Sequence, residues 1–421
     1  MPISPGDKLG PDEILAPIGK SGMGQADFSV SVLKDGTAFA SLKPEWEVLF
    51  AQSSNQHFFH DFSWNFHSWN CVTAASGAEL RIIVGRECGR AVLIFPLMVK
   101  NRIGRFLTAE AFAYRDILLA DNHNDDWFHA TWNTLLGLKD FDILHLQNVR
   151  LPSNFERMLM IVKPRVWCVD TYSPVITLRN YKNWEIFALS RPKKLIADQR
   201  RQWRRINALV PNLQHIWVQD KLEVDRLIHW MIDQKASWAK HKGITRMIWS
   251  SGRENVLMRV AQDACEAGRL LVLKLADGEN VIAAGMGFVH NTQFTFELFS
   301  YDLKWENLSP SRLLLEHLIR WCMDKRVEVF DFLPQAPQGS LYKYDWADDK
   351  IKSTSYLIPI TARGSALIHL RRVDVSAIAK SKVASWIYYK LPKATRGLLQ
   401  YFANISSSSR GKVWAKLRFD R

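Results

Sequence analysis

Cysteine is scarce in this chain, and long apolar runs are missing. The 421 residues include five widely spaced cysteines without a CxxC pair, namely Cys71, Cys88, Cys168, Cys265 and Cys322. This pattern argues against a disulfide framework or a zinc knuckle and favours a reducing compartment. The longest apolar runs, such as residues 91–99, are too short to span a bilayer, and residues 1–25 hold no signal-peptide run. We therefore expect a cytoplasmic protein without a signal peptide.

Common catalytic signatures are also missing. Residues 19–21 end like a phosphate loop, but a Walker A motif needs glycine where this chain has Ile14. The histidines within residues 57–67 lack HExxH spacing and stand among bulky aromatic residues, so we expect no bound metal. No Ser-His-Asp triad stands out. These observations argue against nucleotide hydrolysis and metal-assisted chemistry.

The positive charge of the chain is concentrated at its end. The net charge is +14, and residues 361–421 hold 13 Lys and Arg against two Asp and Glu. The other residues are therefore nearly balanced. A hydrophobic content of 47% is normal for a soluble globular protein, and the length suits two domains. The composition predicts two ordinary domains followed by a basic tail.

The first part of the chain predicts a leader and one α/β module. Residues 1–36 are rich in Gly, Pro, Ser and Asp and show no sustained period, so we interpret them as a flexible leader. Residues 37–180 contain helical patterns at 44–51 and 57–70 and a hairpin around Cys88-Gly89. Strand-like runs follow at 113–119 and 143–146, with a helix between them. This order predicts a βαβ arrangement.

The second part predicts a longer α/β module at residues 190–358. A strand at 213–218 precedes helices at 221–241 and 253–267, and a hairpin turns at Asp277-Gly278. Thr292–Tyr301 then alternates as a strand, a helix begins near Pro310, and 327–333 is a second strand. This strand–helix–strand unit has the length of a parallel crossover, and the N-terminus of its helix suits an anionic ligand. The order is therefore strand, two helices, three antiparallel strands, helix and strand.

The segments NLSPSRLLLEHLIRW, VEVFDFLPQ and GSLYKYDW in residues 307–346 resemble the acetyltransferase family associated with cellulose biosynthesis. That family belongs to the GNAT (Gcn5-related N-acetyltransferase) superfamily and is similar in plan to Fem-type peptidyltransferases. FFHDFSWNFHSW and DILHLQNV resemble the first half of the same family, so the resemblance covers residues 37–358. It implies an α/β fold (α+β layered) of two tandem GNAT-like modules, with mixed sheets flanked by helices. The first module lacks a phosphate-loop equivalent and is interpreted as degenerate.

The resemblance implies transfer of an acyl group from acetyl-CoA or another acyl-CoA to an amine or hydroxyl. Its family name implies a sugar or lipid-linked precursor of a cell-surface polysaccharide as the acceptor. The CoA pyrophosphate would meet the helix N-terminus, where the family usually has Ser-Pro-Gly and this chain has Ser311 instead of glycine. The predicted cofactor-binding residues are Ser309, Ser311, Arg312 and Leu313.

The catalytic candidates lie in the same unit. Glu297 and Tyr301 share one face of the strand at 292–301, as a carboxylate base and a phenol acid would need to. In this superfamily the same strand supplies a backbone N–H for the acyl oxygen. Asp331 points inward and needs a partner, for which Lys343 is our candidate. Asp331, Tyr342 and Lys343 match the family pattern. Simpler interpretations stay open: the serines at the helix start only cap the helix, Glu297 is an outward polar residue, and Asp331 and Lys343 form a structural ion pair.

Two basic segments lie outside this unit. Residues 190–206 hold seven basic residues and one acid in a helical pattern, which suits a solvated face, the CoA 3′-phosphate or nucleic acid. We expect no specific nucleic-acid binding, because no recognition fold accompanies the segment. Residues 359–421 form a basic tail of helical period with several aromatic residues. Its part at 376–402 suits either peripheral contact with the inner face of the membrane or docking on the core.

Two further functions stay open on the sequence alone. A Fem-like transferase that uses aminoacyl-tRNA is favoured by the basic segment at 190–206, although no inserted coiled-coil arm is seen. A non-catalytic binding protein with a GNAT fold is favoured by Ser311 at the helix entrance. An acyl-CoA-dependent acyltransferase is our leading hypothesis.

Overall fold

The computed structural model describes residues 8–9, 12–17, 27–107, 113–244, 251–334, 342–370 and 415–417. The chain divides into two compact units, which are described separately. Unit 1 comprises Met1–Thr108, Tyr114–Thr171 and Lys352–Arg421, and unit 2 comprises Ala109–Ala113 and Tyr172–Ile351. The chain thus changes unit within two strands, β9 (Val166–Thr177) and β15 (Asp349–Pro359). The sequence-based division placed these boundaries at residues 180–190 and at residue 358.

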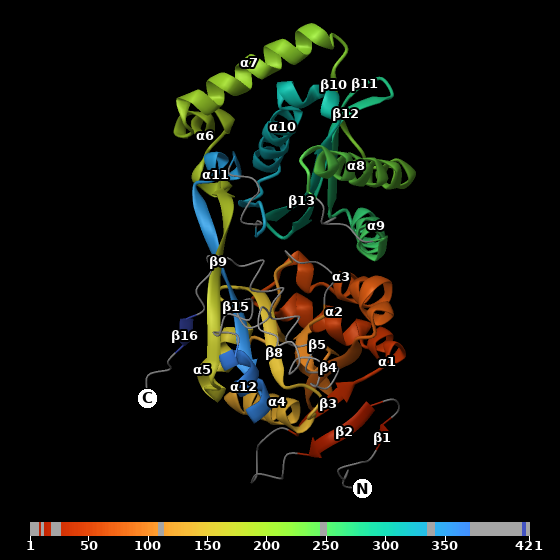
Figure 1. Cartoon of the computed structure of the whole chain (residues 1–421), viewed down its shortest axis with the longest axis vertical. Coiled ribbons are helices and arrows are strands. Elements are labelled where there is room, and N and C mark those ends of the chain that lie inside the picture. Colours follow the sequence, from red (N-terminus) through yellow and green to blue (C-terminus); the bar gives the residue numbers. More distant parts are fainter. Residues whose placement is uncertain are drawn as a thin grey trace, which may run out of the picture. The chain divides into compact units, whose positions relative to one another are not determined.

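Unit 1 is a mixed sheet with helices packed on it (Figure 1). Its strands are β1 (Lys8–Leu9), β2 (Asp12–Pro17), β3 (Phe28–Leu33), β4 (Glu79–Glu87), β5 (Arg90–Lys100), β6 (Ile103–Phe106), β7 (Leu118–Leu119), β8 (Ile143–Arg150), the start of β9 (Val166–Thr177), most of β15 (Asp349–Pro359) and β16 (Ala415–Leu417). Its helices are α1 (Gly36–Ser41), α2 (Lys43–Gln52), α3 (Phe62–Ser68), α4 (Asp125–Gly137), α5 (Asn154–Val162) and α12 (Ala362–Leu370), with short helical turns at Phe58–His60, Trp69–Thr73 and Ala74–Ser76.

The sheet of unit 1 is antiparallel except at one place. The strand order is β1-β2-β3-β4-β5-β6-β8-β15, and β6 runs parallel to β8 with Ile103 opposite Ile143. Apolar side chains of β3, β4, β5 and β8 pack with those of α2, α4 and α5 in one continuous core. The alternation and length of the apolar runs, which the sequence shows directly, account for these strands.

Unit 2 repeats this plan with fewer strands. Its strands are the end of β9, then β10 (Gln214–Trp217), β11 (Leu270–Asp277), β12 (Asn280–His290), β13 (Gln293–Tyr301) and β14 (Val329–Asp331). Its helices are α6 (Trp184–Ser190), α7 (Lys193–Leu209), α8 (Lys221–His241), α9 (Ser251–Glu266), α10 (Pro310–Asp324) and α11 (Tyr342–Trp346), with helical turns at Leu178–Asn180 and Leu303–Leu308. The order expected for residues 213–333, strand, two helices, three antiparallel strands, helix and strand, is confirmed.

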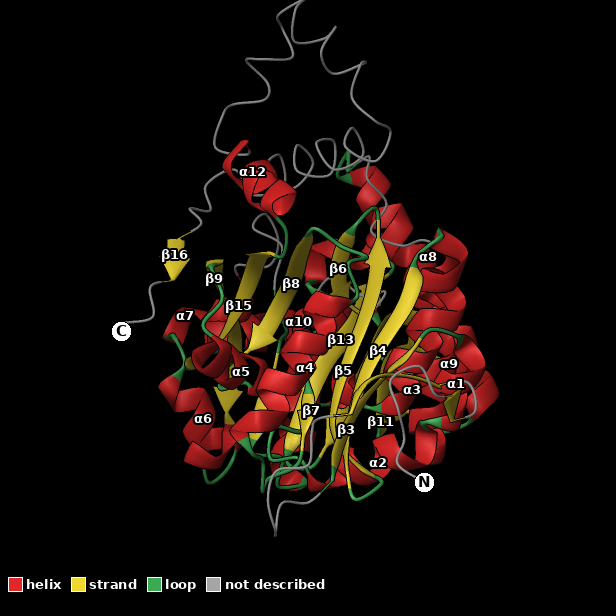
Figure 2. Ribbon diagram, turned by 90° about the horizontal axis from the view of Figure 1, so that it is seen from below, coloured by secondary structure: helices red, strands yellow, loops and turns green. Residues whose placement is uncertain are grey.

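The sheet of unit 2 positions the site. Its order is β9-β14-β13-β12-β11-β10, and β13 and β14 are parallel. Helix α10 lies on one side of β11–β13, and α8 and α9 lie on the other (Figures 1 and 2). Gly285 allows α10 to approach closely, because a Cβ there would come within 2.6 Å of Leu314 Cδ2. The predicted fold class, mixed sheets flanked by helices in two modules, is confirmed.

Three local predictions need correction. Residues 28–33, part of the expected leader, form β3 and pair with β4, because alternating Val30 and Val32 are buried in the core. The helix expected at 57–70 is divided at Asp61, whose carboxylate caps α3 by accepting from Ser63 N–H at 2.8 Å. The strand expected at 113–119 is reduced to β7. The helical tail expected at 376–402 lies outside the described residues.

Candidate active site

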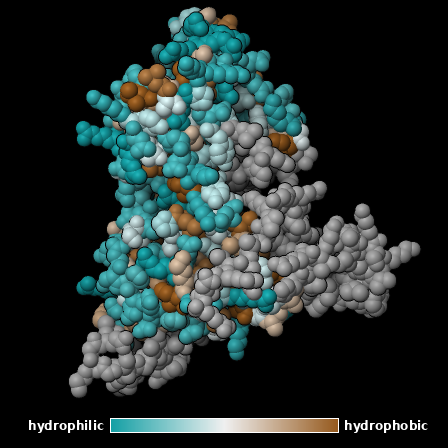
Figure 3. Space-filling view, turned by 90° about the vertical axis from the view of Figure 1, so that its left-hand side faces the viewer, coloured by the Kyte–Doolittle hydropathy of each residue, from teal (hydrophilic) through white to brown (hydrophobic). Residues whose placement is uncertain are grey.

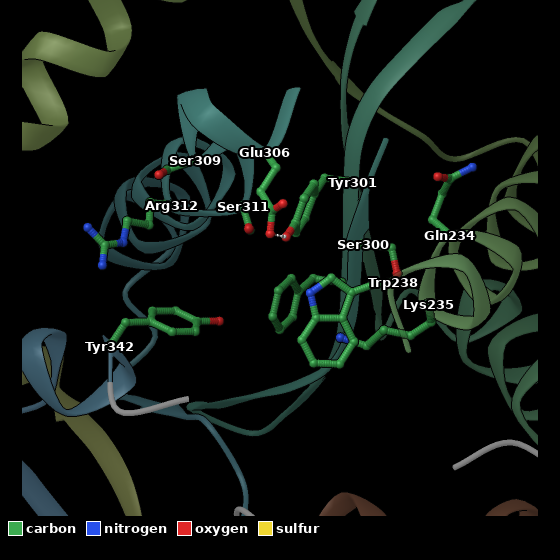
Figure 4. Close-up of a pocket in the computed structure, with 11 residues that line it drawn as sticks. Gln234, Lys235, Trp238, Ser300, Tyr301, Glu306, Ser309, Ser311, Arg312 and Tyr342 are labelled. Carbon is green, nitrogen blue, oxygen red and sulfur yellow. Dashed lines mark hydrogen bonds between the residues drawn. The ribbon is translucent and has the colours of Figure 1, made fainter. Parts of the chain in front are cut away.

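Unit 2 contains a cavity of about 400 Å³ at the start of α10 (Figure 4). Five elements surround it: α8, the end of β13, the helical turn at Leu303–Leu308, the start of α10, and α11. The lining residues are Gln234, Lys235, Trp238, Phe299, Ser300, Tyr301, Glu306, Ser309, Ser311, Arg312 and Tyr342. In Figure 4, Arg312 and Tyr342 lie on one side of the space, and Lys235 and Trp238 lie on the other.

The cavity lies beside the edge of β13 that faces β14, where the described pairing between the two strands is short. β14 pairs with β13 over three residues, ending at Thr295 opposite Asp331. On the other edge the register shifts, so that Gly287 opposes Phe296 and Met286 opposes Leu298. Glu297 is therefore an extra residue, a β-bulge, which bends the strand. In the part of the chain that the structure describes, the ladder between β13 and β14 ends at Thr295, so the bulge lies beyond that ladder.

The start of α10 is built without a side-chain cap. Ser309 has a left-handed backbone, with φ of 52°, and its side chain makes no capping hydrogen bond, contrary to the expectation of a serine cap. Pro310 has no N–H, and the N–H groups of Arg312 and Leu313 donate to Ser309 O at 2.9 and 3.4 Å. An anion at this end would therefore meet the Ser311 N–H, two hydroxyl groups and the Arg312 guanidinium.

A hydrogen-bond chain crosses one wall of the cavity. The Tyr301 hydroxyl donates to Glu306 Oε1 at 3.4 Å and accepts from the Trp238 indole. Glu306 also pairs with Lys242 Nζ at 2.9 Å, and this contact holds the pKa of Glu306 below its ordinary value. Burial, followed by the charge of Glu306, raises the pKa of Tyr301. The phenol is thus protonated at neutral pH and points its oxygen toward the cavity.

Two lysines flank the ring of Phe299. Lys235 Nζ lies 4.2 Å from the ring centroid and Lys343 Nζ lies 5.8 Å from it. Lys343 is 6% exposed and donates to Phe332 O at 3.2 Å. Burial lowers the pKa of Lys343 to about 7, with a further lowering by Lys235 that the charges of Asp331 and Glu297 oppose. Burial also lowers the pKa of Lys235 to about 8. Both amines thus have appreciable neutral populations near pH 7.

The structure places the predicted residues in two groups. Tyr301, Tyr342, Ser309, Ser311 and Arg312 line the cavity. The side chain of Leu313 is fully buried in the core of unit 2 instead.

The other three predicted residues lie behind the lining. Asp331 is fully buried, accepting from Gln293 Nε2 at 3.1 Å and from Leu333 N–H at 2.7 Å. Glu297 is half-buried, and its charge, like that of Asp331, acts on Lys343. The interaction expected between Asp331 and Lys343 therefore has an electrostatic counterpart, while the lysine donates its hydrogen bond to a carbonyl.

Six lining residues were absent from the sequence-based site: Gln234, Lys235, Trp238, Phe299, Ser300 and Glu306. A signal for one of them existed. Lys235 follows Met231 by four positions on the inward face of α8, where a lysine breaks an apolar pattern. A cation on such a face needs an explanation. Glu306 gave no signal, because its role depends on the fold of the turn at Leu303–Leu308.

No group of His, Cys, Asp or Glu in the described ranges has the geometry to hold a metal ion. Within the same ranges, no helix combines the length and the apolar character that crossing a membrane requires.

Comparison with known proteins identifies the domain that carries this cavity. Residues 193–344 match the family model described as the acetyltransferase (GNAT) domain, and this range includes every residue that lines the cavity. This match agrees, at the superfamily level, with the resemblance of residues 307–346. No curated protein matches the chain.

Solved structures resemble the chain over most of its length. The C-terminal domain of a putative lysylphosphatidylglycerol synthetase from Agrobacterium fabrum is 11% identical, with a TM-score of 0.50; the match covers 80% of this chain and 95% of that one. FemX is 8% identical, covering 75% and 95%, with a TM-score of 0.48. A tandem GNAT protein from the clavulanic acid biosynthesis pathway is 10% identical, covering 79% and 99%, with a TM-score of 0.45. The first of these supports the fold of the 80% of the chain that it covers.

Proposed function

We propose that the chain is an acyltransferase that takes an acyl group from acyl-CoA and delivers it to an amine or hydroxyl. The observation that carries this proposal is the cavity of unit 2, which lies between an uncapped basic helix start and the bulged part of β13, beyond the described end of its ladder with β14. The first supports binding of a phosphate, and the second supports binding of a thioester carbonyl.

The donor would lie along the edge of β13. Ser311 N–H, the two serine hydroxyls and Arg312 would hold the pyrophosphate. The pantetheine chain would follow β13 toward the bulge at Glu297, where a backbone N–H would stabilise the oxygen of the tetrahedral intermediate. Lys343, with its charge partly retained at neutral pH, would add to that stabilisation.

Proton transfer would use the wall that β13 and the turn before α10 form. Tyr301 is protonated and points into the cavity, so it would return a proton to the departing thiolate. Glu306 orients the phenol through their hydrogen bond. Glu297 and Asp331 would act through Lys343, by setting the balance between its charged and neutral forms.

For the acceptor we propose the class that the resemblance implies, a sugar or a lipid-linked precursor of a cell-surface polysaccharide. We also propose that the module at 190–358 performs the chemistry and that the module at 37–180 is a degenerate copy. The family match at residues 193–344 supports this division. The sparse cysteines support a cytoplasmic location.

A binding experiment tests the donor. Acetyl-CoA, a longer acyl-CoA and free CoA are added to the full chain, and thermal unfolding is followed. A ligand at 100 times its dissociation constant stabilises the folded state by about 2.7 kcal/mol, so a rise in Tm is expected. Arg312→Ala should reduce this rise, whereas Arg204→Ala, which removes an exposed cation of α7, should leave it unchanged. No rise with any CoA species would overturn the proposal.

A second candidate donor is aminoacyl-tRNA, because α7 presents a row of exposed cations. The upper part of the molecule, where α7 lies, is mostly hydrophilic (Figure 3). The exposed basic residues of α7 are Lys193, Lys194, Arg200, Arg201, Arg204 and Arg205. If charged tRNA is the donor, it should bind more weakly to Arg204→Ala than to the unmodified chain, and CoA should give no shift.

A further inference from the structure

Lys235 is an amine inside the proposed acyl-transfer cavity. It comes from α8, on the side of the cavity opposite Arg312 (Figure 4). Its ammonium lies between two aromatic rings, 4.2 Å from the centroid of Phe299 and 5.7 Å from that of Trp238. In the described part of the chain it has neither an acidic partner nor a hydrogen bond, and burial alone accounts for its lowered pKa. The ring faces replace only part of the hydration it has lost.

The surroundings explain why this amine stays unpaired. Glu306 faces the same cavity, but its carboxylate is engaged by Lys242, Tyr301 and His241. Glu297 and Asp331 act electrostatically on Lys343. Burial of the amine among these engaged groups therefore favours the neutral form of Lys235, which is the nucleophilic form of an amine.

We propose that Lys235 is a self-acylation site, modified by the acyl-CoA bound in the same cavity. The inference rests on the proposed donor. The Lys235 nitrogen attacks the thioester carbonyl carbon, a C–N bond forms and the C–S bond breaks. The thiolate leaves as CoA and takes up a proton, and the amine loses its proton to water. The product is an Nε-acyl-lysine and free CoA, with no further reactant.

Such an amide would not pass the acyl group onward, because amides are far less reactive than thioesters. The modified side chain would be neutral and longer, and it would occupy the space in which an acceptor must meet the donor. Self-acylation would therefore lower transfer to the acceptor when acceptor is scarce. A pKa of about 8 in place of 10.5 raises the neutral fraction at pH 7 about 300-fold, which favours Lys235 over an exposed lysine.

Mass spectrometry of the full chain tests the proposal without a known acceptor. The chain is incubated with acetyl-CoA and digested with trypsin. Acetylation of Lys235 blocks cleavage and joins residues 227–235 and 236–240 into one peptide. The exposed Lys240 at the end of that peptide is the internal reference. Lys235 is expected to be acetylated at least tenfold faster than Lys240.

Ser311→Asp is the matched control, because it places a negative charge where the donor phosphates would bind, leaving Lys235 in place. In this variant the rate at Lys235 should fall to that at Lys240. A thermal shift with acetyl-CoA, without preferential acetylation of Lys235, would overturn this inference and leave the proposed function standing. Preferential acetylation that persists in Ser311→Asp would also overturn it, since the bound donor would not be responsible. The absence of both the shift and the acetylation would overturn the proposed function as well.

Discussion

The two units have a similar order of strands and helices, but the N-terminus of one helix differs between them. In unit 1, α4 begins with Asn124 as a cap that accepts from Asp126 N–H at 2.9 Å, and Asp125 and Asp126 stand in its first turn. In unit 2, the corresponding α10 begins with uncapped Ser309 and carries Arg312. A capped, acidic helix start has its N–H groups satisfied and repels phosphate, whereas an uncapped basic one attracts it.

The spaces beside two strands, β6 of unit 1 and β13 of unit 2, differ in the same sense. Beside β6, unit 1 leaves a cavity of about 10 Å³, since Trp46, Phe59 and Tyr114 fill it. Beside β13, unit 2 leaves about 400 Å³ lined by hydroxyls and charges. Asp116, at the edge of the small cavity, accepts from the N–H groups of Asn154 and Phe155 at 2.8 Å. At this place in unit 1, the carboxylate of Asp116 binds backbone N–H groups of its own unit. In unit 2, hydroxyl and charged groups line the cavity instead.

The largest expected effect separates a filled space from an open one. Trp46→Ala removes a side chain that is 1% exposed and packs against Phe39 and Phe62, so unit 1 should lose about 3–5 kcal/mol of stability. Trp238→Ala, on α8 of unit 2, removes a half-buried side chain at the cavity and should cost only about 1 kcal/mol. Denaturant unfolding of each variant measures both values.

Ligand binding should show the reverse order. Trp238→Ala should weaken the acyl-CoA thermal shift, because the indole lines the cavity and donates to Tyr301. Trp46→Ala should retain the acyl-CoA thermal shift, as long as the shift is measured at temperatures at which unit 1 is still folded. If Trp46→Ala and Trp238→Ala lost the same stability, the contrast between a filled space in unit 1 and an open cavity in unit 2 would be wrong.

The second-largest effect is expected when the start of α10 is given an acidic residue like those at the start of α4. Ser311→Asp puts an acidic residue at the position that Asp126 occupies in α4. It should weaken acyl-CoA binding by about 30-fold, or about 2 kcal/mol, through repulsion of phosphate. It should leave the Tm without ligand unchanged or slightly higher, since an acid in the first helical turn is favourable.

The matched variant is Ser311→Gly, which restores the residue usual in the resembling family. It should bind acyl-CoA at least as tightly, at a cost of about 1 kcal/mol in helix stability. Calorimetric titration of both variants gives the dissociation constants. Unchanged affinity in Ser311→Asp would place the donor phosphates elsewhere.

Local patterns predicted the elements well. The bounds of α8 agree with the predicted helix at 221–241, because Leu227, Ile228 and Met231 follow helical spacing and are buried. The hairpin of β11 and β12 followed from Asp277-Gly278, whose glycine has φ of 55°. Each of these signals is contained within a few neighbouring residues.

The predicted residues that line the cavity are those whose positions follow from local sequence. Ser311, Arg312 and Tyr301 lie next to strand and helix boundaries that the pattern reveals. Lys235 and Glu306 reach the cavity only after α8 and the turn before α10 pack around β13, so no spacing along the chain brings them together. The left-handed backbone of Ser309 likewise depends on tertiary packing, since serine alone favours a capping conformation.

The smallest expected effect concerns pH and compares the buried charges beside the two clefts. The folded-state pKa of Lys343 is about 7, below its unfolded value near 10.5, so the unfolded chain binds more protons between these pH values. Stability should therefore rise with pH in that window. Relative to Lys343→Met, the unmodified chain should gain about 1–2 kcal/mol between pH 7 and pH 9, measured by denaturant unfolding.

Asp116 supplies the control in unit 1. Burial raises its pKa to about 7, so its contribution to stability falls as pH rises from about 4 to 7 and is then constant. The difference between the unmodified chain and Asp116→Asn should therefore be flat between pH 7.5 and pH 9, where the Lys343→Met difference still grows. If both differences stayed flat, Lys343 would keep an ordinary pKa in the folded chain. Its proposed part in stabilising the acyl oxygen would then rest on a full charge, with no neutral population for Glu297 and Asp331 to control.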